Sequence, residues 1–308
     1  MITSSADLQP ALTWNLVADI RQVLEFPFMV NAFRAGAIVA VLAGLVGWFM
    51  VLRRQTFAGH TLALVGFPGA AGAVLIGVSA SYGLFAFAVA AALVIALVPA
   101  GGRTGGEASA VTGTVQAFSL ACGFLFVTLY GGFLGGANAL LFGSFLGITA
   151  QQVMVLLAVA AASLAVLAVI ARPLLFSSVD PDVAAARGVP VRALSVVFLV
   201  LLGVSAASVS QITGTLLVFA LLVVPAATAQ AWTPRPVLGA ALTVALGLAV
   251  TWVSLFVAYY TPYPIGILLT SIAFTVYLLA GGWRRLEAIR ARRPRVRSRA
   301  RDVLGTVP

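Results

Sequence analysis

The sequence has no lysine, one histidine and one cysteine, and each scarcity excludes a kind of chemistry. A phosphate-binding loop of the Walker A type needs a lysine, so this chain cannot hold ATP in that way. The glycine-rich piece at 101–107 is therefore expected to be a turn. The single Cys122 cannot form an intrachain disulfide or a cysteine zinc cluster. If any step uses ATP, another subunit must hold the nucleotide.

Charged residues are also scarce. They make up 8% of the chain, while hydrophobic residues make up 62%; a soluble domain is about one quarter charged. All acidic residues fall outside the long apolar runs. A carrier coupled to protons or sodium usually needs a carboxylate inside the membrane. The absence of such a carboxylate from the apolar runs disfavours an ATP-independent secondary carrier.

Long apolar runs recur along the chain, and each is long enough to cross a bilayer as a helix. They predict an all-α, polytopic transmembrane bundle of about nine spans, with eight as the lower count. The predicted spans are 32–52, 60–79, 83–100, 111–130, 152–171, 192–209, 214–231, 237–259 and 264–282.

The arginines predict how this bundle is oriented. With the N-terminus outside and the C-terminus in the cytoplasm, all arginines except Arg21 and Arg34 lie inside, which is sixteen of eighteen. This follows the positive-inside rule. Much of the net charge of +10 lies between Arg284 and Arg301. Its placement favours anionic membrane lipid as the partner and argues against nucleic acid.

Three parts are expected along the chain. Residues 1–30 form an extracytoplasmic or interfacial segment, in which Leu16–Val30 is either an amphipathic helix or a loosely ordered leader. Residues 31–282 form the transmembrane domain, and 283–308 form an Arg-rich cytoplasmic tail. The apolar, glycine-rich stretch 131–151 is predicted to be a short helix or re-entrant segment packed against protein.

The longest polar connection, 172–192, is predicted to contain a short helix outside the bilayer. Asp180 or Ser178 can cap its start, and Pro181 suits the first helical position. Gly188-Val189-Pro190 then ends it. The predicted helix has charged ends and an alanine-rich middle.

His60 is the candidate metal ligand, because a neutral imidazole binds transition metals and ionisable groups at membrane depth are often functional. The alternative is an interfacial histidine bonded to backbone or water. Pro68-Gly69 and Pro225 interrupt apolar runs. Such positions either line a cavity and act as hinges or simply kink a helix.

Several blocks give the chain a family resemblance. It resembles the membrane permease subunits of the zinc/manganese/iron ABC importers of bacteria. The blocks that carry the resemblance are Gly36 to Gly47 with FMVLRRQTFAG and FPG at 67–69, LLFGSFLGIT at 140–149, DPDVAAARGVPV at 180–191, ITGTLLVFALLVVPAATAQAW at 212–232 and PYPIGILL at 262–269.

The resemblance implies a multi-pass protein of the bacterial plasma membrane that is not itself an enzyme and binds no cofactor. It implies a permease homodimer, two cytoplasmic ATP-binding subunits and an extracytoplasmic metal-binding protein. The ATPases would dock on a coupling helix at about 178–190. Its contact residues would be Asp180, Pro181, Asp182, Ala185 and Gly188, while Pro68, Gly69 and Pro225 would mark helix breaks used in gating.

The second span departs from the family pattern F-x-G-D-A-L-S-H-x-x-L-P-G, whose Asp and His are thought to contact the metal. Here His60 stands at the Asp position and Leu64 at the His position. An imidazole without carboxylates favours zinc over manganese as the transported ion. The altered pair leaves open a metal chelate or a small cofactor as the cargo.

Overall fold

The computed structural model describes residues 15–98, 105–130, 147–215 and 218–304, and no strand occurs within these ranges. Eight helical spans are long and apolar enough to cross a membrane. This confirms the predicted all-α membrane bundle. The helices are α1 (Leu16–Leu24), α2 (Pro27–Leu52), α3 (Thr56–Leu64), α4 (Gly66–Leu75), α5 (Ala80–Leu97), α6 (Gly105–Leu129), α8 (Ala150–Val179), α9 (Pro181–Ala186), α10 (Val191–Thr213), α11 (Val218–Trp232), α12 (Pro236–Tyr260) and α13 (Ile265–Leu304).

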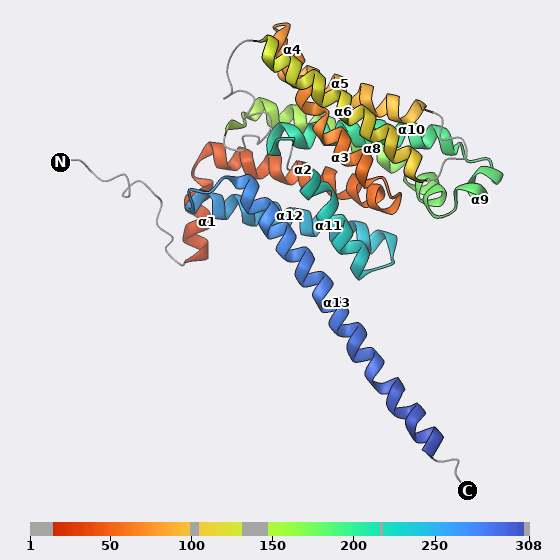
Figure 1. Ribbon diagram of the computed structural model, residues 1–308. Coiled ribbons are helices and arrows are strands. Elements are labelled where there is room, and N and C mark those ends of the chain that lie inside the picture. The colour runs from red at the N-terminus through yellow and green to blue at the C-terminus, as the bar shows by residue number, and fades with distance from the viewer. Residues whose placement is uncertain (1–14, 99–104, 131–146, 216–217, 305–308) are drawn as a thin grey trace.

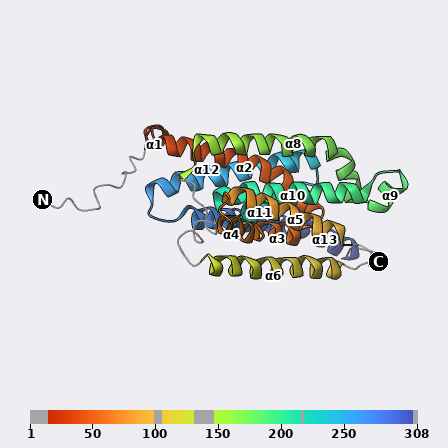
Figure 2. The same ribbon diagram turned by 90° about the horizontal axis from the view of Figure 1, so that it is seen from above.

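The long helices run between the two ends of the bundle at different tilts, and α13 diverges from the others (Figure 1). The short helices α1 and α9 lie at opposite ends of the bundle in both Figure 1 and Figure 2. Seen from above, α6 and α8 lie at opposite outer sides, with α10 and α11 between them (Figure 2). Helices α3 and α4 together form one candidate span, whereas α11 is shorter than the other eight.

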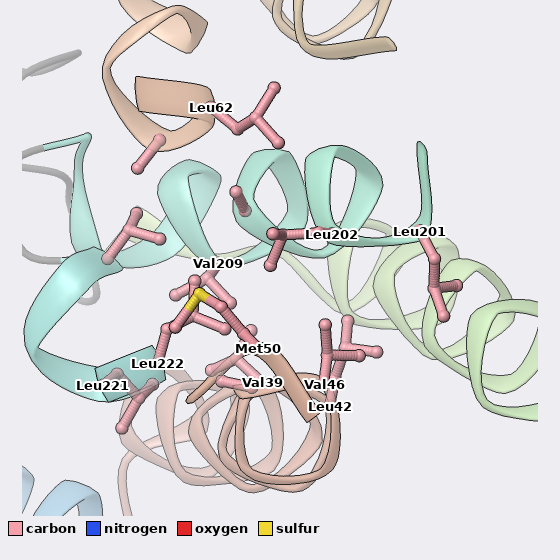
Figure 3. Packing of buried hydrophobic residues seen from close by; sticks show 14 of the residues in the cluster. Val39, Leu42, Val46, Met50, Leu62, Leu201, Leu202, Val209, Leu221 and Leu222 are labelled. Carbon is pink, nitrogen blue, oxygen red and sulfur yellow. The ribbon is translucent and has the colours of Figure 1, made fainter. Parts of the chain in front are cut away.

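The core is built around α2. Its residues Val39, Leu42, Val46 and Met50 point towards α10 and α11 (Figure 3), and all four are fully buried. In the apolar 18-residue stretch of α2, two-thirds of the residues are buried. Glycine makes this approach possible. A side chain at Gly47 would collide with the carbonyl oxygen of Leu222 in α11.

A second close approach joins α4 to α5. A Cβ atom at Gly69 would collide with the carbonyl oxygen of Gly83, and one at Gly83 would collide with that of Gly69. Small residues that let two backbones meet are a common means of helix association in membranes. Gly69 therefore has a packing role here.

Helix α8 is longer than predicted. It was expected to end at residue 171, but it continues through Pro173 to Val179. Thirty residues of helix span about 45 Å, more than the roughly 30 Å of a hydrocarbon core. Arg172 therefore lies within a helix that extends beyond the bilayer. The position of this charged residue did not predict where the helix ends.

The start of the bundle also differs from the prediction. A helix was considered over Leu16–Val30, but α1 ends at Leu24 and α2 begins at Pro27. Asn15 caps α1 by accepting a hydrogen bond from the backbone N–H of Ala18. Proline is favoured in the first turn of a helix, so Pro27 starts a new helix instead of continuing α1.

The glycine-rich stretch 131–151 was predicted as a short helix or re-entrant segment, and residues 131–146 of it lie outside the described residues. Thr149 then starts α8 with a capping box, in which Thr149 and Gln152 bond each other's backbone. At the other end of the chain, α13 continues to Leu304 and projects away from the bundle (Figure 1).

Candidate functional site

His60 lies in the second turn of α3, which packs against α6, α10 and α11. Its side chain is half-buried. The imidazole meets the ring of Phe219 at the start of α11 edge to face, with ring centroids 5.0 Å apart. The histidine therefore faces the α11 side of α3, where an aromatic ring limits its movement.

The residues next to His60 are buried. Leu64 lies one turn further along α3 and is 8% exposed. Thr61 is fully buried, and its hydroxyl donates a 2.9 Å hydrogen bond to the side-chain oxygen of Gln116 in α6. This bond ties the α3 segment that carries His60 to an outer helix.

The donor set in one copy of the chain is small. Among the described residues, no group of three or more His, Cys, Asp or Glu side chains could together hold a metal ion. His60 offers one nitrogen ligand, and the buried Leu64 offers none. A metal ion at this place would need ligands from elsewhere, such as a second copy, backbone carbonyls or water.

The helix break lies one turn before the predicted Pro68-Gly69. Val65 is the single residue that separates α3 from α4. Proline lacks an N–H and its ring clashes with the carbonyl four residues earlier, which is that of Leu64. The disturbance is therefore felt upstream of Pro68. The helix break at Val65 directly follows the part of α3 that carries His60 and Leu64.

Pro225 is a buried residue inside α11, and the helix continues past it. It does not end the helix. Proline in a membrane helix is tolerated where neighbouring helices cover the freed backbone. Here α2 and α13 pack against α11, and Gln230 donates a 2.7 Å hydrogen bond to the carbonyl of Trp48.

The short helix between α8 and α10 is present as α9. Asp180 is its N-cap and accepts a 3.0 Å hydrogen bond from the backbone N–H of Val183. Pro181 is the first helical residue, and Gly188 has a φ of +80°, a conformation that favours glycine after a helix end. Asp182 and Ala185 are exposed, whereas Ala184 is fully buried. One face of α9 is thus anchored and the other is open.

The predicted residues form two separate groups. His60 and Pro68 belong to the α3–α4 span, whereas Asp180, Asp182 and Ala185 belong to α9, whose main neighbours are α8 and α10. The sequence prediction missed Phe219 and Gln116 as neighbours of the α3 segment. Gln116 carried a usable signal, since an amide inside an apolar span usually has a partner.

A bundle of apolar helices, packed through glycine contacts and carrying a short capped helix at one end, is the architecture of a membrane-spanning protein. The model of the ABC 3 transport family matches residues 25–282, and the chain belongs to this family. The match covers nearly the whole bundle, from α2 to the membrane part of α13.

The chain is similar to transport proteins of other bacteria. The chain is 30% identical to the manganese transport system membrane protein MntC of Halalkalibacterium halodurans, over 72% of this chain and 75% of that protein. It is 29% identical to the manganese import system permease protein ScaB of Streptococcus parasanguinis, over 81% and 89%. Among solved structures, it is similar to PsaBC from Streptococcus pneumoniae in complex with Fab, with a TM-score of 0.75, 25% identity, and 86% and 95% coverage.

Proposed function

We propose that this chain is the membrane permease subunit of an ATP-binding-cassette importer for a divalent transition-metal ion. The observation that carries the proposal is the family match over residues 25–282, together with the similarity to proteins named for manganese transport and import over most of their length. The chain has no lysine for a Walker A loop, so hydrolysis belongs to partner subunits. It acts as a transport subunit and catalyses no reaction itself.

The complex would contain two copies of this permease, two ATPases and an extracytoplasmic metal-binding protein. The N-terminus lies outside, and α9 then faces the cytoplasm. ATP binding and hydrolysis move α9, and the bundle alternates between outward and inward access. The break at Val65 caused by Pro68, the tight contact at Gly69 and the proline of α11, Pro225, are the positions where the helices can change shape.

Zinc is the proposed ion, although the relatives named above are named for manganese transport or import. Manganese prefers carboxylate and water oxygens, whereas imidazole suits zinc. The pair at positions 60 and 64 offers one imidazole and no carboxylate. A homodimer would place two His60 side chains around one path and so supply two nitrogen ligands.

Uptake by a strain that lacks its own zinc and manganese importers tests the function. Expression of this permease with its ATPase and binding protein is expected to restore ATP-dependent zinc uptake. His60→Ala is expected to lower that uptake at least tenfold, because no other imidazole is present in the chain. Full zinc uptake by His60→Ala would remove His60 from the site.

The cargo is tested by restoring the family pattern. His60→Asp combined with Leu64→His is expected to shift preference from zinc to manganese, measured as the ratio of initial uptake rates. Uptake of a chelated metal or a small cofactor, with neither free ion transported, would favour the alternative cargo. Transport in vesicles without any ATPase would instead point to a secondary carrier.

The ATPase contact is tested at the open face of α9. Reversing the charge of Asp180 and Asp182, or placing Pro at Ala185, is expected to abolish co-purification of the ATPase. Asp180 caps α9, and proline at 185 would remove a backbone N–H from its last turn. Unchanged co-purification after these substitutions would overturn the assignment of α9 as the coupling helix.

A further inference from the structure

Arg53 forms an unusual set of contacts at one end of the bundle. It is the C-cap of α2, and its backbone N–H donates to the carbonyl of Phe49. Its guanidinium reaches away from α2. One terminal nitrogen, Nη1, donates to the hydroxyls of Ser178 at 3.2 Å and Ser177 at 3.4 Å, and the other, Nη2, donates to Ser195 at 2.8 Å.

The three serines lie on both sides of α9. Ser177 and Ser178 are in the last turn of α8, directly before the N-cap of α9. Ser195 is in the second turn of α10, which starts shortly after α9 ends. One side chain therefore holds together the two helices between which α9 is suspended. Because α9 packs mainly on α8 and α10, its position depends on how these two helices meet.

Arg53 also lies at the start of the turn between α2 and α3, the helix that carries His60. Arg54 follows with a φ of +57°, and the backbone N–H of Gln55 bonds the carbonyl of Met50, which closes the turn. Helix α3 begins at Thr56 and carries His60 in its second turn. A shift of Arg53 would thus be felt at the start of α3.

Burying the Arg53 guanidinium is costly in free energy if its only role is to stabilise the fold. The guanidinium is partly buried, lies 5.5 Å from the centroid of the fully buried Phe198 ring, and bonds to hydroxyls. Burial lowers the pKa of Arg53 from its usual value, yet arginine keeps its charge in proteins. Within the described residues its Nε is buried without a hydrogen-bond partner. A partly satisfied buried charge is weak evidence for a purely stabilising role.

The fork of arginine matters for this geometry. Its nitrogens point in fixed directions and can serve acceptors on two helices at once. A lysine ammonium is a compact point charge and cannot reproduce the same span. By contrast, Arg54 is exposed and provides a natural comparison of equal charge one residue away.

We propose that Arg53 is a positioning residue for transport, which links the α8 and α10 flanks of α9 to the turn before the His60 helix. Movement of α9 then reaches α3 through this guanidinium. The inference rests on the proposed function, in which α9 receives the ATPase.

The test uses the complete transporter, with its own ATPase and binding protein, reconstituted in lipid vesicles with zinc as the probe. Arg53→Gln is expected to keep ATPase co-purification and to leave ATP hydrolysis within about twofold of the unsubstituted complex. Zinc transported per ATP hydrolysed is expected to fall at least tenfold. Arg54→Gln, which removes the same charge from an exposed position, is expected to leave that ratio unchanged.

Two further variants separate positioning from folding. Arg53→Lys is expected to restore thermal stability but not the transport ratio, because one ammonium cannot bridge α8 and α10. Ser178→Ala combined with Ser195→Ala keeps the arginine and removes acceptors on both flanks, and it is expected to lower the ratio as well. This pair carries the test if Arg53→Gln fails to fold.

The outcomes distinguish this inference from the proposed function. If the unsubstituted complex transports zinc and both Arg53→Gln and the serine pair keep its ratio, the positioning role is wrong and the proposed function stands. A proportional fall of stability, hydrolysis and transport would also overturn it in favour of a structural role. If no ATPase binds the unsubstituted permease, the proposed function fails first and the inference fails with it.

Discussion

The α3–α4 span and the α6 span lie side by side but differ in their surroundings. In the apolar 18-residue stretch of the α3–α4 span 78% of the residues are buried, compared with 17% in that of α6. The buried span is nevertheless the least hydropathic of the eight. It carries His60, Thr61 and several glycines, whereas α6 presents Phe118, Phe124 and other large side chains to its outer face.

The difference between the two spans follows from what surrounds each of them, lipid or protein. A helix that faces lipid must be apolar, because hydrocarbon offers no hydrogen bonds. A helix surrounded by protein can carry polar side chains and close backbone contacts, since its neighbours satisfy them. In this protein the least hydropathic span is therefore also the most buried one, and it carries the candidate metal ligand His60.

The largest expected effect concerns the contact between α4 and α5. Gly69→Leu is expected to prevent the folded protein from accumulating, because its Cβ would collide with the backbone of Gly83. Gly281→Leu in α13 serves as the control, since nothing lies within 4 Å of a Cβ at that exposed position. The measurement is the yield of monodisperse protein after extraction. Equal yields would show that the close approach is not required.

A cavity in the centre should have an intermediate effect. Phe198→Ala in α10 is expected to cost about 2–3 kcal/mol of stability. The loss comes mainly from packing contacts, because moving an apolar side chain from lipid into the bundle gains little free energy. Phe118→Ala, at a position 71% exposed, should change stability by less than about 0.5 kcal/mol. Thermal unfolding in one detergent compares the two. Similar losses for both would contradict the division into inner and outer helices.

The smallest effect is expected for the bond between the two spans. Thr61→Val removes the hydrogen bond to Gln116 and should cost about 0.5–2 kcal/mol, the range of such bonds in membrane proteins. Thr114→Val in α6 is the control, because that hydroxyl bonds the carbonyl of Ala110 in its own helix. If the two variants unfold at the same temperature, the bond between α3 and α6 contributes nothing measurable.

Much of the architecture could be predicted from the sequence because hydrocarbon imposes strict rules. Apolar runs gave the all-α bundle, and Asp180, Pro181 and Gly188 gave α9 through capping chemistry that acts over a few residues. The end of α8 was wrong, because neither Arg172 nor Pro173 stops a helix that extends beyond the bilayer. The start of α2 was placed too late, because the favourable position of Pro27 was not used.

The site shows the same limit. His60 stood out as the only histidine, and the family pattern predicted it as a metal-contact residue at the position of the usual Asp. Its contact with Phe219 joins residues far apart in the chain, and local sequence carries no such information. Likewise, Ser178 and Ser195 are ordinary residues until the fold brings both to Arg53.

By itself, then, the sequence determined which segments can enter a membrane, which residues could chemically serve a metal or an ATPase, and to which kind of transporter the chain is similar. These properties depend on composition and on contacts within a helical turn. Only the tertiary structure decided which spans are central, where α3 breaks, and which distant hydroxyls surround Arg53. Those outcomes depend on how helices of nearly equal hydropathy pack against each other, and glycine contacts and buried hydrogen bonds select that packing.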